Sequence, residues 1–328
     1  RREVYRAYPD VHFSLIIQIE PDKMNVIGDT VFLMNMISDM SRIDFRLYKN
    51  SQAAGRMIFS VQDDFMISGM LADDKRCMAV NISTEEDNCR WMFEKLSELC
   101  TRDALLYRPS TIRSLVEEQG YQYSMLSMNK RWYIGHMTEC FLPDELFEEL
   151  LVHATKEMNL EMNVTQLRYL HALTRKTLEE SHIRVIIYED ALSDLVVGRT
   201  ISFFGCRLKL SLSQIQTYLK CLQHTCLKHL NLEVKLAIGK FVKDYQYEMT
   251  QCIFISDSIS YLRLNTENRE NNLALFNHLD MTEIFGRFFD EVWESSDGKC
   301  LSESTEIKHF FDHMIQSTEI QSGISFSF

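Results

Sequence analysis

Two groups of cysteine, histidine and glutamate side chains have spacings that invite a metal-binding interpretation. The first is the run Cys221-Leu222-Gln223-His224-Thr225-Cys226-Leu227-Lys228-His229. On a helix, at about 100° per residue, its four possible ligands point in widely separated directions and do not converge on a tetrahedral zinc ion. The second group pairs His309 with His313 one turn apart, and Glu306 lies one turn earlier. Because these three also fit the polar face of an amphipathic helix, we predict no metal site.

Acidic pairs and phosphate-binding loops could both support hydrolytic chemistry. Asp63-Asp64 and Asp73-Asp74 fall at predicted turns, where Asp is favoured for structural reasons. The sequence lacks a glycine-rich dinucleotide motif, a P-loop, a His-Glu-x-x-His pair and a Gly-x-Ser-x-Gly elbow. These absences disfavour nucleotide enzymes, zinc proteases and serine hydrolases, and we predict no cofactor.

Composition narrows the class of protein further. The 328 residues predict about two domains, and 45% hydrophobic with 25% charged residues is typical of a folded chain. The net charge of -12 disfavours a surface that neutralises phosphate, so we do not expect this chain to bind nucleic acid directly. Apolar runs stop far short of the roughly 20 residues that span a bilayer. Nine scattered cysteines and the lack of a signal peptide favour the cytoplasm.

Hydrophobic periodicity predicts the same order of elements twice. In the first half we expect strands at 13–19 and 43–48 on either side of a helix at about 29–40, then strands at 57–61, 65–67 and 77–80. A capping box at Ser83-Thr84-Glu85-Glu86 is predicted to open the next helix. In the second half the matching strands are 183–188, 232–236, 252–256, 259–264 and 273–276.

The helices of the second half also have recognisable starts. Ser211-Leu212-Ser213-Gln214 is a predicted capping box for a helix to about residue 230, and Asp280-Met281-Thr282-Glu283 is predicted to cap the last helix of the repeat. Between the halves, Pro143 and the cap Asn163-Val164-Thr165-Gln166 predict two connecting helices. We therefore predict an α/β protein of two pseudo-repeated lobes: residues 1–104, a helical connector with short strands at 105–181, a second lobe at 182–300, and a C-terminal helix and tail at 301–328.

This duplicated arrangement resembles the phospholipase D superfamily, in which each lobe supplies a His-x-Lys-x-x-x-x-Asp motif and the active site forms where the lobes meet. Such a site needs one His to attack phosphorus, a second His to protonate the leaving group, and two Lys to hold the phosphoryl oxygens. With Asp63 as the motif Asp, the His and Lys positions hold Arg56 and Ile58; with Asp257, they hold Thr250 and Cys252. The resemblance therefore implies a catalytically degenerate fold.

The second half also resembles the C-terminal effector regions of bacterial helix-turn-helix transcription regulators, especially along residues 281–293. That resemblance implies a non-catalytic sensing and dimerisation module with a small-molecule effector and no membrane contact. The chain begins at Arg1, which fits a DNA-binding domain upstream. A helix-turn-helix at about residues 150–170 is disfavoured because Glu148, Glu149, Glu157 and Glu161 surround it.

On this hypothesis the former catalytic cleft becomes a ligand pocket or a packed seam. Its candidate ligand-binding residues are Arg56, Asp63, Thr250, Cys252 and Asp257. The apolar stripe at 284–293, or its counterpart around Trp91, would form a homodimer surface if exposed and otherwise packs within a lobe. The abundant Met residues, 17 in all, suit either an adaptable apolar surface or the core. Two alternatives stay open: a phosphoesterase that uses Asp63, Asp64 and a metal, and a purely structural dimerisation protein.

Overall fold

The computed structural model describes residues 12–20, 22, 24–41, 44–53, 56–73, 76–158, 160–229, 231–239, 250–266, 271–295 and 300–325. Contacts divide the chain into two compact units. Unit 1 comprises Arg1–Met24, Ile43–Arg108 and Asn277–Met281, and unit 2 comprises Asn25–Arg42, Pro109–Phe276 and Thr282–Phe328. The predicted division into four consecutive segments stays a prediction.

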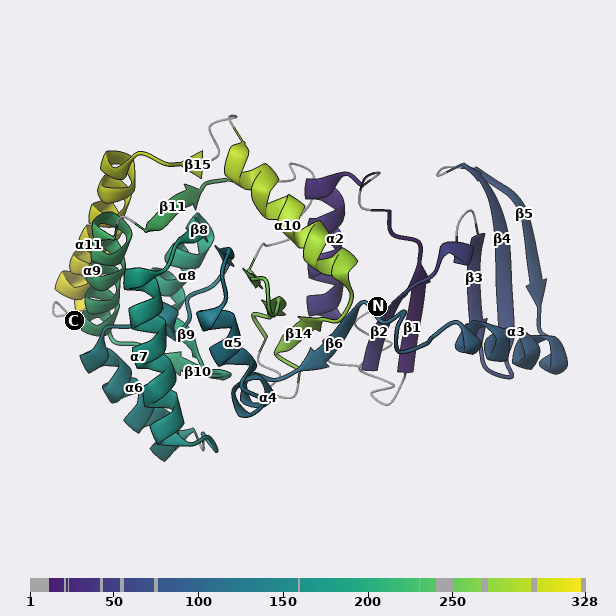
Figure 1. Ribbon diagram of the computed structural model, residues 1–328, viewed down its shortest axis with the longest axis horizontal. Coiled ribbons are helices and arrows are strands. Elements are labelled where there is room, and N and C mark those ends of the chain that lie inside the picture. Colours follow the sequence, from purple (N-terminus) through teal and green to yellow (C-terminus); the bar gives the residue numbers. More distant parts are fainter. Residues whose placement is uncertain are drawn as a thin grey trace. The chain divides into compact units, whose positions relative to one another are not determined.

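Unit 1 contains two small sheets (Figure 1). In the first, β1 (His12–Ile17) runs parallel to β2 (Asp44–Lys49). A short 3-10 helix, η2 (Ser51–Ala53), leads to the second sheet, an antiparallel meander of β3 (Arg56–Val61), β4 (Phe65–Asp73) and β5 (Arg76–Ser83). The helix α3 (Glu86–Glu98) follows and packs against β3 and β4.

The start of α3 differs from the prediction. Its N-cap is Glu85, which makes no side-chain capping bond, and the Ser83 hydroxyl instead accepts from the backbone N–H of Glu85 at 3.3 Å. The predicted capping box at Ser83 is therefore wrong. The physical reason is that β5 runs through Ser83, so this residue is still held by strand pairing with Met66, and the helix begins three residues later at Glu86.

Unit 2 is built on one large mixed sheet, whose order is β15-β11-β8-β7-β12-β13-β14-β6. The bounds are β6 (Tyr107–Ser110), within which the chain passes from unit 1 to unit 2, β7 (Lys130–Ile134), β8 (Ile183–Tyr188), β11 (Leu232–Ala237), β12 (Cys252–Ile255), β13 (Tyr261–Arg263), β14 (Leu273–Phe276) and β15 (Cys300–Leu301). β8 pairs parallel with β7 and β11, whereas β12, β13 and β14 form an antiparallel meander joined to β7 through β12. A separate hairpin is formed by β9 (Thr200–Phe203) and β10 (Cys206–Lys209).

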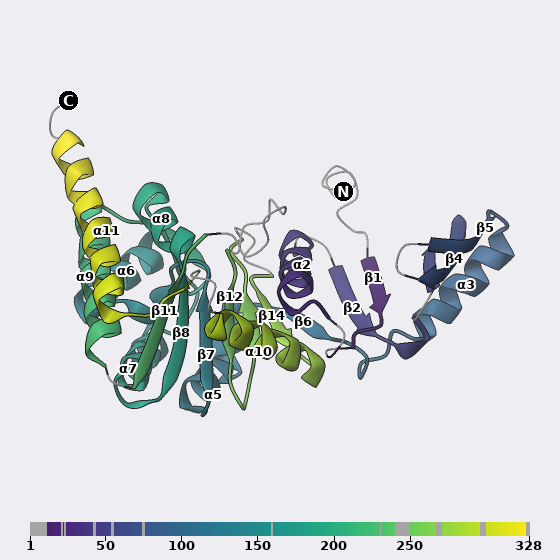
Figure 2. The ribbon, with the colours of Figure 1, turned by 90° about the horizontal axis from the view of Figure 1, so that it is seen from above.

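The helices of unit 2 are α2 (Val26–Asp39), α4 (Ile112–Glu117), α5 (Gly120–Leu126), the 3-10 helix η3 (Glu139–Phe141), α6 (Asp144–Glu157), α7 (Val164–Glu180), α8 (Glu189–Gly198), α9 (Leu212–Lys228), α10 (Leu279–Glu294), whose first residues belong to unit 1, and α11 (Ser304–Ser325). Figures 1 and 2 show α9 and α11 side by side. Among the described residues, no helix is both long and apolar enough to cross a membrane.

Two of the predicted helix caps in unit 2 are confirmed. The Asn163 side chain accepts from the N–H of Gln166 at 3.2 Å, and Ser211 and Gln214 form a reciprocal capping box at the start of α9. The predicted cap at Asp280 is wrong, because α10 already begins at Leu279 and places Asp280 in the first helical turn. There its carboxylate is still favoured by the positive end of the helix dipole.

The sheet of unit 2 is covered on both faces, because successive side chains along its central strands are buried in opposite directions. Trp132 of β7 packs edge-on against Phe141 of η3, while its neighbour Tyr133 packs edge-on against Phe288 of α10. A strand that is buried on both faces has a nearly continuous run of apolar residues in its sequence, and residues 183–188 form such a run. The stripe of α10 predicted as a possible dimer surface is instead core: Ile284, Phe285, Phe288, Phe289 and Val292 are buried.

The α/β class is confirmed, and both halves share an order of pairing. A parallel pair (β1 with β2, β8 with β11) is followed by an antiparallel meander (β3 to β5, β12 to β14) and a helix. In unit 2, β7 lies between β8 and β12 and joins the two groups into one sheet, whereas in the described part of unit 1 they are separate sheets. The likeness to phospholipase D lobes stays a prediction.

Candidate functional site

Two of the predicted ligand-binding residues lie in unit 1, at the two ends of β3. Arg56 opens the strand and is exposed. Asp63 lies in the turn to β4 with a left-handed φ of 59°, a conformation that Asp adopts more readily than most residues. Its carboxylate accepts from Arg90 Nε of α3 at 2.8 Å. Because a strand rises about 3.3 Å per residue, Arg56 and Asp63 lie roughly 20 Å apart along the direction of β3. They therefore do not form one site.

The other three predicted residues lie in unit 2, and two of them meet at a histidine. The Thr250 carbonyl lies 2.6 Å from Nδ1 of His136, and the Cys252 Sγ lies 3.5 Å from the same nitrogen. The Cys252 thiol also donates to the His136 carbonyl at 3.3 Å. Asp257 lies beyond the other end of β12, where its exposed carboxylate accepts from Asn129 at 2.9 Å. The structure therefore brings Thr250 and Cys252 together around His136, and Asp257 is not part of that group.

His136, which sequence reasoning missed, is buried just beyond the end of β7. Burial, helped by the positive charge of Arg263, lowers the pKa of His136 to about 3. The ring is therefore neutral at neutral pH, with its Nδ1–H donated to the Thr250 carbonyl. Its other nitrogen, Nε2, is a buried acceptor with no partner among the described residues. A single His after a short strand carries no sequence signal that would have marked it.

Cys252 is an inert thiol rather than a nucleophile in this setting. Burial raises its pKa to about 12, so that the thiolate, which is the reactive form, is not populated near neutral pH. The neighbouring Cys140 is similar, since burial raises its pKa to about 11 and its sulfur lies 3.7 Å from the Tyr121 hydroxyl. The cysteines of this centre behave as small apolar side chains.

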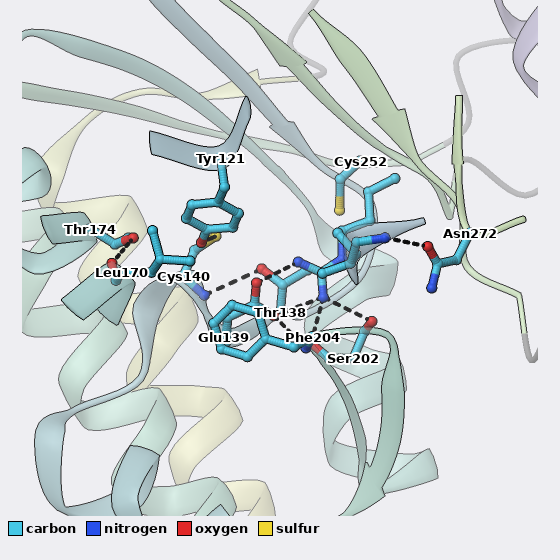
Figure 3. A network of polar contacts seen from close by, with 12 residues as sticks. Tyr121, Thr138, Glu139, Cys140, Leu170, Thr174, Ser202, Phe204, Cys252 and Asn272 are labelled. Carbon is cyan, nitrogen blue, oxygen red and sulfur yellow. Dashed lines mark hydrogen bonds and ion pairs between the residues drawn. The ribbon is translucent and has the colours of Figure 1, made fainter. Parts of the chain in front are cut away.

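The centre of the site is a buried ion pair between Arg263 of β13 and Glu139 of η3 (Figure 3). Both side chains are 2% exposed, and the two guanidinium nitrogens each donate to one carboxylate oxygen at 2.7 Å. Burial by itself disfavours the charged guanidinium, but the charge and hydrogen bonds of Glu139 more than compensate and raise the pKa of Arg263. Arg263 therefore keeps its charge, and Glu139 is the group that it is paired with.

This ion pair also holds the β9–β10 hairpin. Arg263 donates to the carbonyl and hydroxyl of Ser202 at 3.0 and 3.1 Å, and the N–H of Phe204 donates to Glu139 at 3.2 Å. Phe204 has a φ of 44° and Gly205 a φ of 83°, so the turn needs positive φ at both central residues, as a type I′ hairpin does. A positive φ is strained for a bulky residue such as Phe204, and the surrounding bonds keep it there.

Glycine is required at position 205 for a second reason. A Cβ built on Gly205 would lie 2.8 Å from Nδ2 of Asn272, which follows from the close packing of the hairpin against the segment before β14. The amide oxygen of Asn272 in turn accepts from the Ile112 N–H at 2.9 Å (Figure 3). The polar network therefore connects the sheet, η3, the hairpin and the start of α4.

Within the part of the chain that the structure describes, no group of three or more His, Cys, Asp and Glu side chains is arranged to hold a metal ion. The run that contains Cys221, His224 and Cys226 lies on α9, and His309 and His313 lie on α11. The arrangement at His136 has buried acceptors and a neutral thiol but offers no ionised nucleophile. Its chemistry is that of a closed, internally bonded polar core.

Comparison with known proteins places the chain in no family. No family model matches the sequence, and no curated protein matches it. Among solved structures, TrmBL2, described as an archaeal chromatin protein with a novel mode of DNA binding, aligns with 11% identity and a TM-score of 0.29. The alignment covers 66% of this chain and 62% of the TrmBL2 chain, so less than two thirds of the length of TrmBL2 is matched.

Proposed function

We propose that this chain is a non-catalytic sensing and dimerisation module of a transcription regulator of the bacterial type. In this proposal it acts in the cytoplasm, forms a homodimer, responds to a small-molecule effector, and leaves contact with DNA to a separate domain. One observation carries the non-catalytic part. Thr250 and Cys252, at the positions where a phospholipase D lobe has its His and Lys, pack around a neutral, buried His136.

Hydrolysis of a phosphodiester needs a nucleophile with a free lone pair and cations that can reach the phosphoryl oxygens. The Nε2 atom of His136 keeps a free lone pair, but it is buried away from solvent, and Cys252 remains a protonated thiol. The guanidinium of Arg263 is already paired with Glu139. Burial, protonation and ion pairing therefore keep His136, Cys252 and Arg263 from acting on a phosphodiester.

The same network suits a part that transmits a signal. The Arg263–Glu139 pair connects β13, η3 and the strained hairpin at Phe204, which are far apart in the sequence. Coupling through a protein can be carried by such a contiguous set of polar and packed contacts between elements. An effector that shifts the hairpin would have to break or move this pair, and the change would reach the sheet.

The test of the non-catalytic assignment is hydrolysis of bis(p-nitrophenyl) phosphate with Mg²⁺ or Mn²⁺ added. We compare the wild type with the double variant Asp63→Asn/Asp64→Asn and with His136→Asn. We expect all three to match buffer alone, because Asp63 is engaged with Arg90 and His136 is buried and neutral. Turnover by the wild type that either variant abolishes would support the phosphoesterase alternative and overturn the proposal.

A further inference from the structure

One face of the meander β3-β4-β5 is apolar from the Val61–Phe65 pair to the row of Met57, Gly69 and Val80. Strand register places Met57 opposite Gly69 and Val80, and Phe59 opposite Ile67 and Ile82. Val61 pairs with Phe65 at the turn, on the same face. We call this the apolar face, and its side chains are Met57, Phe59, Val61, Phe65, Ile67, Val80 and Ile82.

The sulfur of Cys77 belongs to the apolar face as well. A Cβ built on Gly69 would lie 3.3 Å from Cys77 Sγ and 3.6 Å from Met57 Cε, so both groups lie over this glycine. Cys77 is a free, exposed thiol. From the Val61–Phe65 pair to Gly69, the positions that strand register assigns to this face hold no charged side chain, whereas beyond the irregularity at Leu71 the register pairs Asp73 with Arg76.

The opposite face of the meander is the one that α3 covers. Met66 is buried there, the Ser60 hydroxyl is buried, and α3, which lies beside the meander in Figure 2, contributes the buried Cys89. On the apolar face, by contrast, Met57, Phe59, Val80 and Ile82 are among the exposed large hydrophobic residues. A sheet covered by a helix on one side only leaves its second apolar face without a layer, which folded proteins normally supply.

Size limits what the apolar face can bind. Three strands about 4.8 Å apart and six residues long at about 3.3 Å each give a footprint of roughly 300 Å². Two such faces in contact would remove roughly 600 Å² from water in total, below the ~1,200–2,000 Å² of stable complexes. The face is large enough for a weak, concentration-dependent association and too small for a permanent one.

We propose that the apolar face packs against the apolar face of a second copy of this chain, two sheets forming a sandwich about a twofold axis. A second copy presents an apolar face of the same size and without charged side chains, so no charge loses its hydration. An anionic membrane is a poor occupant, because the acidic Asp64 and Glu86 flank the sheet. The inference deepens the homodimer part of the proposed function and rests on it.

Sedimentation velocity between about 1 and 100 µM tests the proposal, because a weak dimer changes its population across this range. The variants Met57→Asp and Met70→Asp form a matched pair. The Met57 side chain is 52% exposed and lies on the apolar face, and the Met70 side chain is 58% exposed and lies on the face toward α3. Each variant adds one negative charge to the same end of the sheet. We expect Met57→Asp to raise the dissociation constant at least about tenfold and Met70→Asp to leave it within about twofold.

Two further readouts use the native chain. Since each copy carries a net charge of -12, added salt should strengthen the dimer by screening their repulsion. Alkylation of Cys77, followed by peptide mass, should slow as the protein concentration rises. A chain that stays monomeric, or a dimer that both aspartate variants weaken equally, overturns the proposal. Protection of Cys77 that does not depend on concentration shows the face covered within one chain and overturns it too.

The outcomes for the face and for the non-catalytic function are separate. A monomer without phosphodiesterase activity removes the dimer surface and leaves the non-catalytic assignment in place. A dimer with activity that Asp63→Asn/Asp64→Asn abolishes removes the assignment and leaves the surface.

Discussion

Replacing Arg263 by methionine removes one partner of the buried ion pair and leaves the other. The Glu139 carboxylate keeps the Phe204 N–H as its partner, while two donors at 2.7 Å are lost and the side chain is 2% exposed. Breaking a buried pair by removing one partner costs about 3–5 kcal/mol, because an uncompensated charge remains. At about 2–4 °C per kcal/mol for a unit of 150–250 residues, the melting temperature should fall by roughly 6–20 °C.

The assay is urea unfolding followed by the fluorescence of Trp132 and Trp293, which both lie in unit 2. Trp132 is fully buried against Phe141 and Phe254. A Trp91→Phe background removes the signal of the exposed Trp91 of unit 1. This separation matters because two units need not unfold as one transition.

The double-mutant cycle with Glu139→Gln decides whether the loss comes from the pair. We expect Arg263→Met/Glu139→Gln to cost about as much as one single variant, with a coupling energy of about 2–4 kcal/mol. Single variants that cost less than about 1 kcal/mol, or costs that add in the double variant, would refute the claim that Arg263 and Glu139 neutralise one another.

Three further predictions concern the same centre. The pKa of His136 is lowered to about 3 in the folded chain, against about 6.5 when unfolded. The stability that the neutral, buried ring contributes is therefore complete above pH 6.5 and is lost as the pH falls toward 3. Between these values, urea unfolding should show the wild type losing up to about 1.4 kcal/mol per pH unit more than His136→Asn. The same pH dependence in both would contradict this. Cys252, with its pKa raised to about 12, should resist iodoacetamide at pH 8 while the exposed Cys77 is alkylated first, and peptide mass that shows early labelling of Cys252 would disprove its burial. Gly205→Ala should lower the free energy of unfolding by roughly 2–4 kcal/mol, and the control Gly239→Ala by about 1 kcal/mol. Both glycines have a positive φ, but only a Cβ at position 205 would meet Asn272. Equal losses would mean that Asn272 moves aside at little cost.

Much of the secondary structure follows from local sequence. The predicted strands at 183–188, 232–236 and 273–276 match β8, β11 and β14 almost to the residue, and the caps at Asn163 and Ser211 are confirmed. These signals are local: apolar alternation sets a strand, and a side-chain oxygen that satisfies a free N–H sets a helix start. The failures at Ser83 and Asp280 arose where neighbouring structure already held the capping residue or extended the helix by one position.

The candidate site was decided by tertiary structure. Thr250 and Cys252 could be selected from sequence because of their place before Asp257, but their partner His136 lies more than a hundred residues away and reaches them only because β7 pairs with β12. Glu139 and Arg263 carried no motif, since an ion pair across such a separation has no local spacing.

The same limit applies to exposure. Alternation along β3, β4 and β5 shows which residues share a face, but not whether another layer covers that face. The stripe of α10 and the apolar face of the meander both consist of hydrophobic residues in the sequence, yet the first is buried and the second has exposed side chains. The sequence by itself determined the α/β class, many of the strands and two helix caps, because each depends on neighbours along the chain. The tertiary structure decided that His136 is buried and neutral, that Arg263 meets Glu139 and that Met57 is exposed, because burial and charge pairing depend on neighbours in space.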